Sequence, residues 1–380
     1  MKVMGWVLLG GVGLLAAACG GKELRNVGEL NSAAGSGGSA DSNIGGATAG
    51  SASPPQTGTV FQEGLADVKS LATDTTTLYW VEYGSEDSLG NFQNDGRLLA
   101  RDFDSEDVRV LAEDLPGAVD VVVTGRHAYI YVDQYIEGGG PRPALFRMTL
   151  AGADYALVRV LRVVLNETGN VCLGCVVSVD GAAYFVDDSI FRMSDEDPTP
   201  IRVLEQEGSL QVGSLAVDET TLYWTQIGET GTWQAPLTTG VATRVSTQSR
   251  RHLQASGAHL YGIDEEDDSS VFLARMPKDG GSWERLAPRH DGDFSYSLQI
   301  VDDLFFHDLH HDLQLPEGRP GCRWSPNCWK IAQGKLNDTA AAQIVLELPD
   351  AVAPWAWVGT TAGVFWADGA RIRHVPLAVE

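Results

Sequence analysis

The chain contains 380 residues, of which 43% are hydrophobic and 21% charged, and 51 acidic residues outnumber 27 basic ones to give a net charge of −24. A surplus of acid this large repels the phosphates of nucleic acids and the headgroups of anionic lipids, and no basic stripe offsets it. The composition therefore argues against a nucleic-acid partner.

The N-terminal segment has the pattern of an export signal. Lys2 supplies the positive end, an apolar stretch runs from Val3 to Leu15, and small residues follow up to Ala18. This apolar stretch is short for a membrane-spanning helix. Residues 1–18 are therefore predicted to be a signal peptide, and the protein to be exported.

The segment Leu15-Ala16-Ala17-Ala18-Cys19 resembles a bacterial lipobox, from which it departs at Ala16. The resemblance implies that Cys19 becomes the lipidated first residue and anchors the protein to a membrane. The alternative is an ordinary secretory signal cut near Ala18. Since Gly20-Gly21 lacks the Asp that retains many such lipoproteins at the inner membrane, the resemblance favours the outer membrane.

Residues 19–57 form the next segment, dominated by Gly, Ala and Ser, with Pro54-Pro55 near its end. Such a composition buries too little apolar surface to offset the entropy lost on ordering. It predicts a flexible tether between the lipid and a compact domain at residues 58–380.

A four-residue run recurs seven times in that domain. Its first residue is large and hydrophobic, its second is usually aromatic, its third varies, and its fourth is usually an acid. Successive copies are spaced about 40 to 60 residues apart, and a repeat of that length with several short strands is typical of a β-propeller blade. The runs begin at Tyr79, Ile130, Tyr184, Tyr223, Tyr261, Phe305 and Phe365.

The unit around Tyr223 shows four strand-like segments separated by turn residues. Radial stacking lets each four-stranded blade cover its neighbour, and the repeated aromatics then fill the space between blades. The last unit ends after a third strand, Arg371 to Leu377, and one unassigned segment, Thr57 to Leu65, precedes the first blade. The sequence thus predicts an all-β, seven-bladed propeller closed by that N-terminal strand.

The runs Leu78-Tyr79-Trp80 and Leu222-Tyr223-Trp224 resemble those of propellers of the YWTD and NHL kinds, and the unit with Gly262 departs most from them. This resemblance covers residues 58–380. It implies the architecture, but propellers host many unrelated functions, so it does not specify an activity.

Four cysteines remain after Cys19, in the pairs Cys172 with Cys175 and Cys322 with Cys328. Disulfides are the default in an exported chain, and the spacing predicts two local bridges that stiffen loops. A redox-active first pair is the alternative, but it needs a helix N-terminus, and Val176 to Val179 follows as a strand.

The sharpest chemical cluster is the run from His307 to Asp312, with three His and two Asp. These are metal-ligand types, but their spacing matches no closed zinc motif, so an incidental surface loop is preferred and no metal or cofactor is assigned. The loop from Asp308 to Trp329 is the longest insertion in a blade, where binding usually resides. Its proposed contact residues are His310, His311, Arg323, Trp324 and Trp329.

Three functions follow, in order of preference. The first is a membrane-anchored, non-catalytic protein that binds a protein or glycan ligand. The second is a lyase or hydrolase at one mouth of the central channel, which would recruit His127, His252, His259 and His307. The third is a metal sensor built on residues 307–328. No catalytic residue is assigned, because no nucleophile motif such as Gly-x-Ser-x-Gly occurs.

Overall fold

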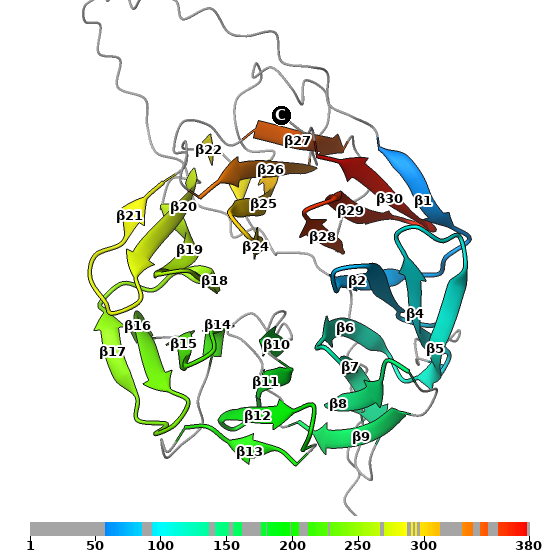
Figure 1. The fold of residues 1–380 in the computed structure, drawn as a ribbon, viewed down its shortest axis with the longest axis horizontal. Helices are drawn as coiled ribbons and strands as arrows, with labels where there is room; N and C mark the ends of the chain where they lie inside the picture. Colours follow the sequence, from blue (N-terminus) through cyan, green and yellow to red (C-terminus); the bar gives the residue numbers. More distant parts are fainter. Residues whose placement is uncertain are drawn as a thin grey trace, which may run out of the picture. The chain divides into compact units, whose positions relative to one another are not determined.

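A computed structural model of the chain describes residues 58–85, 93–136, 141–151, 155–161, 176–179, 181–197, 199–204, 212–226, 229–266, 270–286, 290–291, 293–294, 297–311, 329–336, 343–348 and 356–377. These residues form seven antiparallel sheets, each with at least four strands, arranged as the blades of a propeller (Figure 1). The predicted all-β, seven-bladed architecture is confirmed.

Each blade runs from an inner strand beside the central axis to an outer strand at the rim (Figure 1). Blade 1 contains β2 (Val68–Thr73), β3 (Thr77–Glu82), β4 (Gly96–Asp102) and β5 (Val108–Leu115). Blade 2 contains β6 (Ala118–Val123), β7 (His127–Ile136), β8 (Pro141–Thr149) and β9 (Tyr155–Val160). Blade 3 contains β10 (Val176–Val179), β11 (Ala182–Val186), β12 (Ile190–Ser194) and β13 (Ile201–Arg202). Blade 4 contains β14 (Val212–Val217), β15 (Thr221–Gln226), β16 (Glu229–Pro236) and β17 (Thr243–Ser246).

The remaining blades follow the same order. Blade 5 contains β18 (Arg251–Ser256), β19 (His259–Glu266), β20 (Ser270–Pro277) and β21 (Glu284–Arg285), and β22 (His290–Asp291) pairs with β20. Blade 6 contains β24 (Leu298–Val301), β25 (Leu304–His311), β26 (Trp329–Lys335) and β27 (Gln343–Leu348), and β23 (Asp293–Phe294) pairs with the far end of β25. Blade 7 contains β28 (Trp357–Thr360), β29 (Gly363–Asp368) and β30 (Arg371–Pro376), with β1 (Thr59–Glu63) as its outer strand.

The repeated aromatic pair explains how the blades pack. Successive residues of a strand point to opposite faces of its sheet, so Tyr79 and Trp80 face different neighbours. Tyr79 belongs to the cluster between blades 1 and 2, whereas Trp80 belongs to the cluster between blades 7 and 1. Among the described residues, the buried hydrophobic side chains form seven such clusters, one for each pair of neighbouring blades. The prediction that these aromatics fill the inter-blade space is confirmed.

Gly262 stands where other blades carry an aromatic residue, and the structure gives the reason. A Cβ atom at this position would lie 2.7 Å from Cβ of Arg250. Arg250 precedes β18, which pairs with β19, and its guanidinium reaches Asp264 at 3.2 Å and stands over the Trp283 ring at 5.6 Å. An arginine anchored by an acid thus occupies the place of the missing ring.

Backbone hydrogen bonds reinforce the repeat. In six blades, the residue after the third strand donates its N–H to the carbonyl of the turn between the first and second strands. These bonds are Phe103 to Thr76, Leu150 to Arg126, Asp195 to Gly181, Leu237 to Thr220, Lys278 to Ala258, and Leu336 to Asp303, at 2.7–3.0 Å. Each of these blades is therefore tied at the same corner, independently of its side chains.

Ring closure follows the sequence prediction. Strand β1 pairs antiparallel with β30, from Thr59 opposite His374 to Glu63 opposite Arg371. The Phe61 ring meets the Phe365 ring edge-on at 5.1 Å. From blade 1, the Arg101 guanidinium stands 4.0 Å over the Phe61 ring and donates a hydrogen bond to the Phe61 carbonyl. Both neighbouring blades therefore hold the closing strand.

The closure includes a residue that makes stability depend on pH. Burial lowers the pKa of His374 below its ordinary value of 6.5, opposed in part by a hydrogen bond with the Ala362 carbonyl. As the pH falls through 6.5, the unfolded chain takes up a proton that the folded chain resists, so the free energy of unfolding decreases. His374→Phe keeps the ring stacked on Phe365, 4.3 Å away. We expect the variant to lose less stability than the wild type between pH 7 and pH 5, measured by urea denaturation. Equal losses in the two proteins would contradict this role.

Candidate functional site

The ring has two faces, which the order of strands defines. First strands turn into second strands on one face, for example at residues 74–76, and we call it the short-turn face. Strand β1 begins on this face and β30 ends on it, because Thr59 lies opposite His374. Second strands end on the opposite face, which we call the long-connection face. Strand β25 ends and β26 begins on this face, and residues 312–328 connect them. Strand β9 also ends and β10 begins here, and residues 161–175 connect those two strands.

The proposed binding loop is shorter than the sequence predicted. His310 and His311 are not in a loop: they end β25, where His310 lies opposite both Trp329 and Phe294, and His311 opposite Asp293. The strand continues because β23 extends the sheet beyond the inner strand. Trp329 begins β26 and is 5% exposed, so its ring packs within the protein. The other predicted site residues, Cys19, Cys172, Cys175, Cys322, Arg323, Trp324 and Cys328, lie outside the described residues.

The four histidines of the enzyme hypothesis come from different strands of three blades. His127 begins the second strand of blade 2 and is 4% exposed. His252 and His259 belong to neighbouring strands of blade 5, and His307 is completely buried within β25 of blade 6. His127 and His259 lie on the short-turn face and His252 near the long-connection face, so the fold does not gather these four side chains at one mouth of the ring.

The acids that end the repeated runs serve the fold. Glu82 accepts the N–H of Ala66 at 3.1 Å and pairs with Arg97. In the same way Asp308 accepts the N–H of Ser297 at 2.7 Å, which holds the chain where it enters the inner strand. Asp264 and Asp368 each bind two arginines: Arg250 and Arg285, and Arg371 and Arg373. In these four blades, the acid of the repeat thus fastens the long-connection end of the blade.

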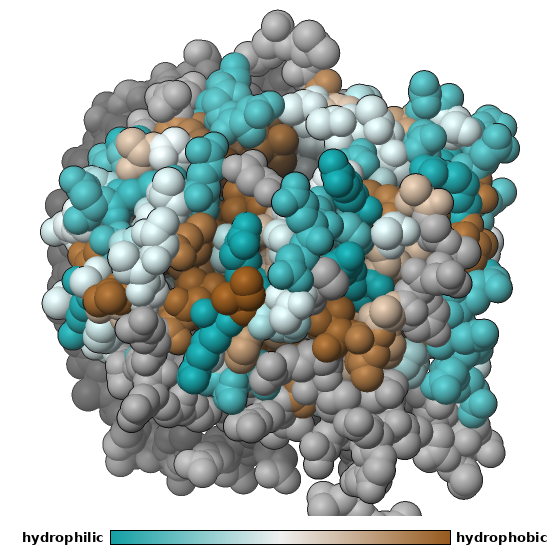
Figure 2. Space-filling model, turned by 60° about the horizontal axis from the view of Figure 1, so that its bottom comes forward, coloured by the Kyte–Doolittle hydropathy of each residue, from teal (hydrophilic) through white to brown (hydrophobic). Residues whose placement is uncertain are grey.

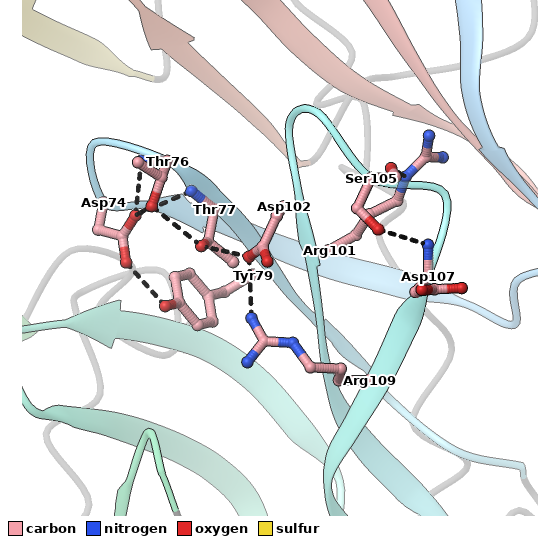
Figure 3. Close-up of polar contacts among 9 residues, drawn as sticks. All are labelled: Asp74, Thr76, Thr77, Tyr79, Arg101, Asp102, Ser105, Asp107 and Arg109. Atoms are coloured by element: carbon pink, nitrogen blue, oxygen red, sulfur yellow. Dashed lines mark hydrogen bonds and ion pairs between the residues drawn. The ribbon is translucent and has the colours of Figure 1, made fainter.

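A second carboxylate organises the short-turn face in blades 1 and 4. In blade 1, Asp74 accepts the N–H groups of Thr76 and Thr77, each at 2.8 Å, and the Tyr79 hydroxyl at 2.7 Å (Figure 3). Next to this turn, Asp102 accepts Thr77 Oγ1 and pairs with Arg109 (Figure 3). An aspartate that satisfies its own turn is an Asx-type motif.

Blade 4 repeats this arrangement. Asp218 accepts the N–H groups of Thr220 and Thr221, the Tyr223 hydroxyl at 3.3 Å, and Lys278 Nζ of blade 5 at 2.6 Å. Burial alone would raise the pKa of Asp218, but the bonds from Lys278 and the turn outweigh it and lower the pKa. Burial, followed by the charge of Asp218, raises the pKa of Tyr223 to about 12. The sequence signal for these turns was present twice, as Asp-x-Thr-Thr-Leu-Tyr-Trp from Asp74 and from Asp218.

Blade 2 obtains its carboxylate from the next blade. Thr124 stands where blades 1 and 4 have aspartate, and Asp195 of blade 3 accepts Thr124 Oγ1 at 2.5 Å and the Arg126 N–H at 3.1 Å. Asp195 also binds His127 Nδ1 at 2.8 Å. No pattern in the sequence pointed to this bond between blades, because its partners lie far apart along the chain in unrelated turns.

Two other kinds of site are absent from the described part of the chain. Among those residues, no group of three or more His, Cys, Asp or Glu side chains is placed to hold a metal ion. Nor does any helix in the described ranges have the length and apolar character needed to cross a membrane.

The rim of the ring combines apolar and polar residues. Figure 2 brings forward the side of the molecule at the bottom of Figure 1 and shows brown, hydrophobic residues interspersed with teal, hydrophilic ones. Among the large hydrophobic residues exposed in the described part are Val110 on β5, Leu157 on β9 and Ile201 on β13, each on an outer strand. Single exposed aliphatics of this kind are ordinary on protein surfaces.

Known structures share the fold of this chain, but none of the matches identifies its function. No model of a known protein family matches the chain, and no curated protein matches it. Solved structures do. A chain of a mitotic checkpoint complex has a TM-score of 0.55 and 10% identity, covering 89% of this chain and 99% of that one. YCF48 bound to D1 peptide has a TM-score of 0.51 and 11% identity, covering 86% and 96%. PorZ, a surface component of the type-IX secretion system of Porphyromonas gingivalis, has a TM-score of 0.50 and 11% identity, covering 84% of this chain and 39% of PorZ. At these identities, the likeness is one of fold.

Proposed function

We propose that this chain is a lipid-anchored lipoprotein of the cell envelope, at the outer membrane, whose propeller binds a protein or glycan without catalysing a reaction. One observation carries the binding proposal. The strands that flank both cysteine-bearing segments, 161–175 and 312–328, end on the long-connection face, so both segments start and finish there. Long connections on a rigid scaffold are the usual place for recognition.

The attachment of the proposed tether is compatible with this role. The chain enters the ring at Thr59 on the short-turn face, opposite the proposed binding face. A flexible chain of the length of residues 19–57 has a root-mean-square span of about 35 Å. The proposed tether therefore joins the propeller on the short-turn face.

Two structural neighbours have roles of this class. One is described as a surface component of a secretion system and one as bound to a peptide. The enzyme alternative has less support, because His127 and His259 begin strands on the short-turn face whereas His252 lies near the start of β18 on the long-connection face.

Cys19→Ala tests the anchor. We expect the wild-type protein in the membrane fraction and the variant in the soluble fraction, because the lipid is the proposed membrane attachment. Immunoblots of fractionated cells measure the distribution. A variant that still pellets with membranes, and is released by detergent, would rule out Cys19 as the anchor.

The cysteine pairs are expected to be oxidised in protein exported by its native route. We predict the bridges Cys172–Cys175 and Cys322–Cys328, because close spacing favours local pairing. Mass spectrometry of peptides from unreduced protein identifies the pairing. Four free thiols, or one zinc ion per chain, would instead favour the metal-sensor hypothesis.

The binding proposal is tested by loop replacement in the full chain. One variant replaces residues 312–327 with a Gly-Ser linker. A matched control replaces residues 337–342, which connect β26 to β27 of the same blade on the short-turn face. We expect pull-downs from the native envelope to lose specific partners with the first variant and keep them with the second.

Equal partner sets for the two variants, with both propellers folded, would remove this segment from the proposal. Turnover of small substrates that is lost on substitution of His127 or His259 would instead establish the enzyme alternative.

A further inference from the structure

The closing strand β1 follows the predicted tether directly, and its direction decides how a pull on the tether acts on the ring. Strand β1 runs from Thr59 on the short-turn face to Glu63 on the long-connection face. It pairs antiparallel with β30, so that Thr59 lies opposite His374 and Glu63 opposite Arg371. The first residues of the two strands therefore lie at opposite ends of their ladder.

This ladder resists forces from different directions unequally. When two antiparallel strands are pulled by their first residues, they must slide past each other, and all the hydrogen bonds between them bear the load together. When one strand is pulled by its first residue and the other by its last, the bonds break one after another from that end. A pull that enters at Thr59 and leaves through the long-connection face is of the first kind, which is a shear load.

A bulge in β1 opposes the sliding that shear requires. The register shifts between Val60 and Gln62, so Phe61 is the extra residue of the strand. Its ring is held from two blades: it meets Phe365 of blade 7 edge-on at 5.1 Å, and the Arg101 guanidinium of blade 1 stands 4.0 Å over it. For β1 to slide along β30, this ring must leave both contacts at once.

Blade 1 also holds the backbone of the closing segment. Arg101 Nη1 donates hydrogen bonds to the Phe61 carbonyl and, at 3.2 Å, to Gln62 Oε1. Beyond the strand, the Ala66 N–H donates to the Glu82 carboxylate at 3.1 Å, which fixes the chain before it enters β2. A pull on the tether is therefore opposed by both neighbouring blades before it reaches β2.

The chain reaches β1 through a close contact with blade 7. Gly58 has a φ of +64°, and a Cβ atom at this position would overlap Cη2 of Trp366. The Trp366 side chain is completely buried, so the ring that the backbone touches is itself fixed by packing. The chain is thus held against blade 7 at the residue that comes directly before the strand.

We propose that β1 is a mechanical clamp, which keeps the ring closed when the tether and a partner on the long-connection face pull in opposite directions. The inference rests on the proposed function, because this load arises only if the chain is anchored through its N-terminal segment and binds on that face. The resistance itself is a property of residues 58–66. It comes from the shear geometry of the ladder and from the bulged Phe61 ring.

Single-molecule force spectroscopy of the full chain compares two directions of pull on the same ladder. One handle is attached at Ser36 in the predicted tether. The other is attached either at Ala370, in the turn before β30, which places the ladder in shear, or at Glu380, beyond the end of β30, which peels the ladder from its Thr59 end. We expect a higher rupture force with the handle at Ala370. A first release of at most about 30 Å of chain identifies the detachment of residues 58–66.

Substitutions show whether the bulged ring supplies the resistance. At constant force in the shear direction, Phe61→Ala should speed rupture by at least about tenfold, which corresponds to about 1.4 kcal/mol. Arg101→Gln should act in the same direction, because it removes the guanidinium that covers the ring. Val60→Ala is the matched control, because Val60 is 45% exposed, and it should rupture like the wild type.

Equal rupture forces in the two directions, or a first release longer than residues 58–66 can supply, would overturn the proposal. So would a folded Phe61→Ala variant that ruptures like the wild type under the shear load. The wild-type comparison needs no substitution in the clamp, so it decides the question even where a variant fails to fold. None of these results depends on lipidation or on partner capture, which test the proposed function separately.

Discussion

Deleting residues 58–66 is expected to lower the melting temperature by about 10 °C, because it removes a whole strand and a packed aromatic ring from the last blade. The deletion exposes the edge of β30 and leaves Phe365 without the Phe61 ring that meets it at 5.1 Å. It also removes the acceptor of the Arg101 hydrogen bond, so the seam between blades 7 and 1 loses contacts on both sides. Differential scanning calorimetry of the full chain and of the deletion measures the effect.

Two controls separate closure from a general effect of shortening. Deleting residues 20–50, which lie in the predicted tether, should leave the melting temperature almost unchanged. Within β1, Phe61→Ala should reduce stability markedly, whereas Val60→Ala should have little effect, because Val60 is 45% exposed. Equal tolerance of the two deletions would show that the pairing of β1 with β30 does not hold the ring closed.

The architecture could be predicted from the sequence because most repeats carry large aromatic residues at the same positions. Trp80, Trp224 and Trp366 are each completely buried at the same position of their blades, and such residues recur wherever blades must pack. The last unit showed only three strands, and one strand-like segment before the first blade was unassigned. That segment, β1, is the outer strand of blade 7. The spacing of buried hydrophobic residues within one blade is visible in a short stretch of sequence, so strands and their repeats can be predicted from it.

The polar contacts could not be predicted in the same way. Asp195 looks like an ordinary turn residue, yet it serves Thr124, Arg126 and His127 of another blade. Such bonds depend on how neighbouring blades meet, which no spacing within one blade encodes. The prediction of a loop that begins at Asp308 failed for a related reason. β23 pairs with the end of β25 and keeps His310 and His311 in the sheet.

Trp224→Ala is expected to reduce the free energy of unfolding by about 3–5 kcal/mol, the usual cost of removing a large buried ring. Trp224 is 0% exposed and fills the space between blades 3 and 4 beside Tyr184, Ile190 and Leu215. Urea denaturation followed by circular dichroism measures the loss. Val241→Ala, at an exposed position of the same blade, should change stability by less than about 0.5 kcal/mol.

Trp224→Phe distinguishes the contribution of the ring from that of its indole N–H. Nε1 of Trp224 is buried and has no hydrogen-bond partner among the described residues, as is also true of Trp80 and Trp366. Phenylalanine removes this unsatisfied donor while keeping most of the apolar contact, so its cost should be clearly smaller than that of alanine. If Phe costs as much as Ala, the second ring of the indole must supply most of the packing contact between the blades, and the unsatisfied N–H is a minor cost beside it.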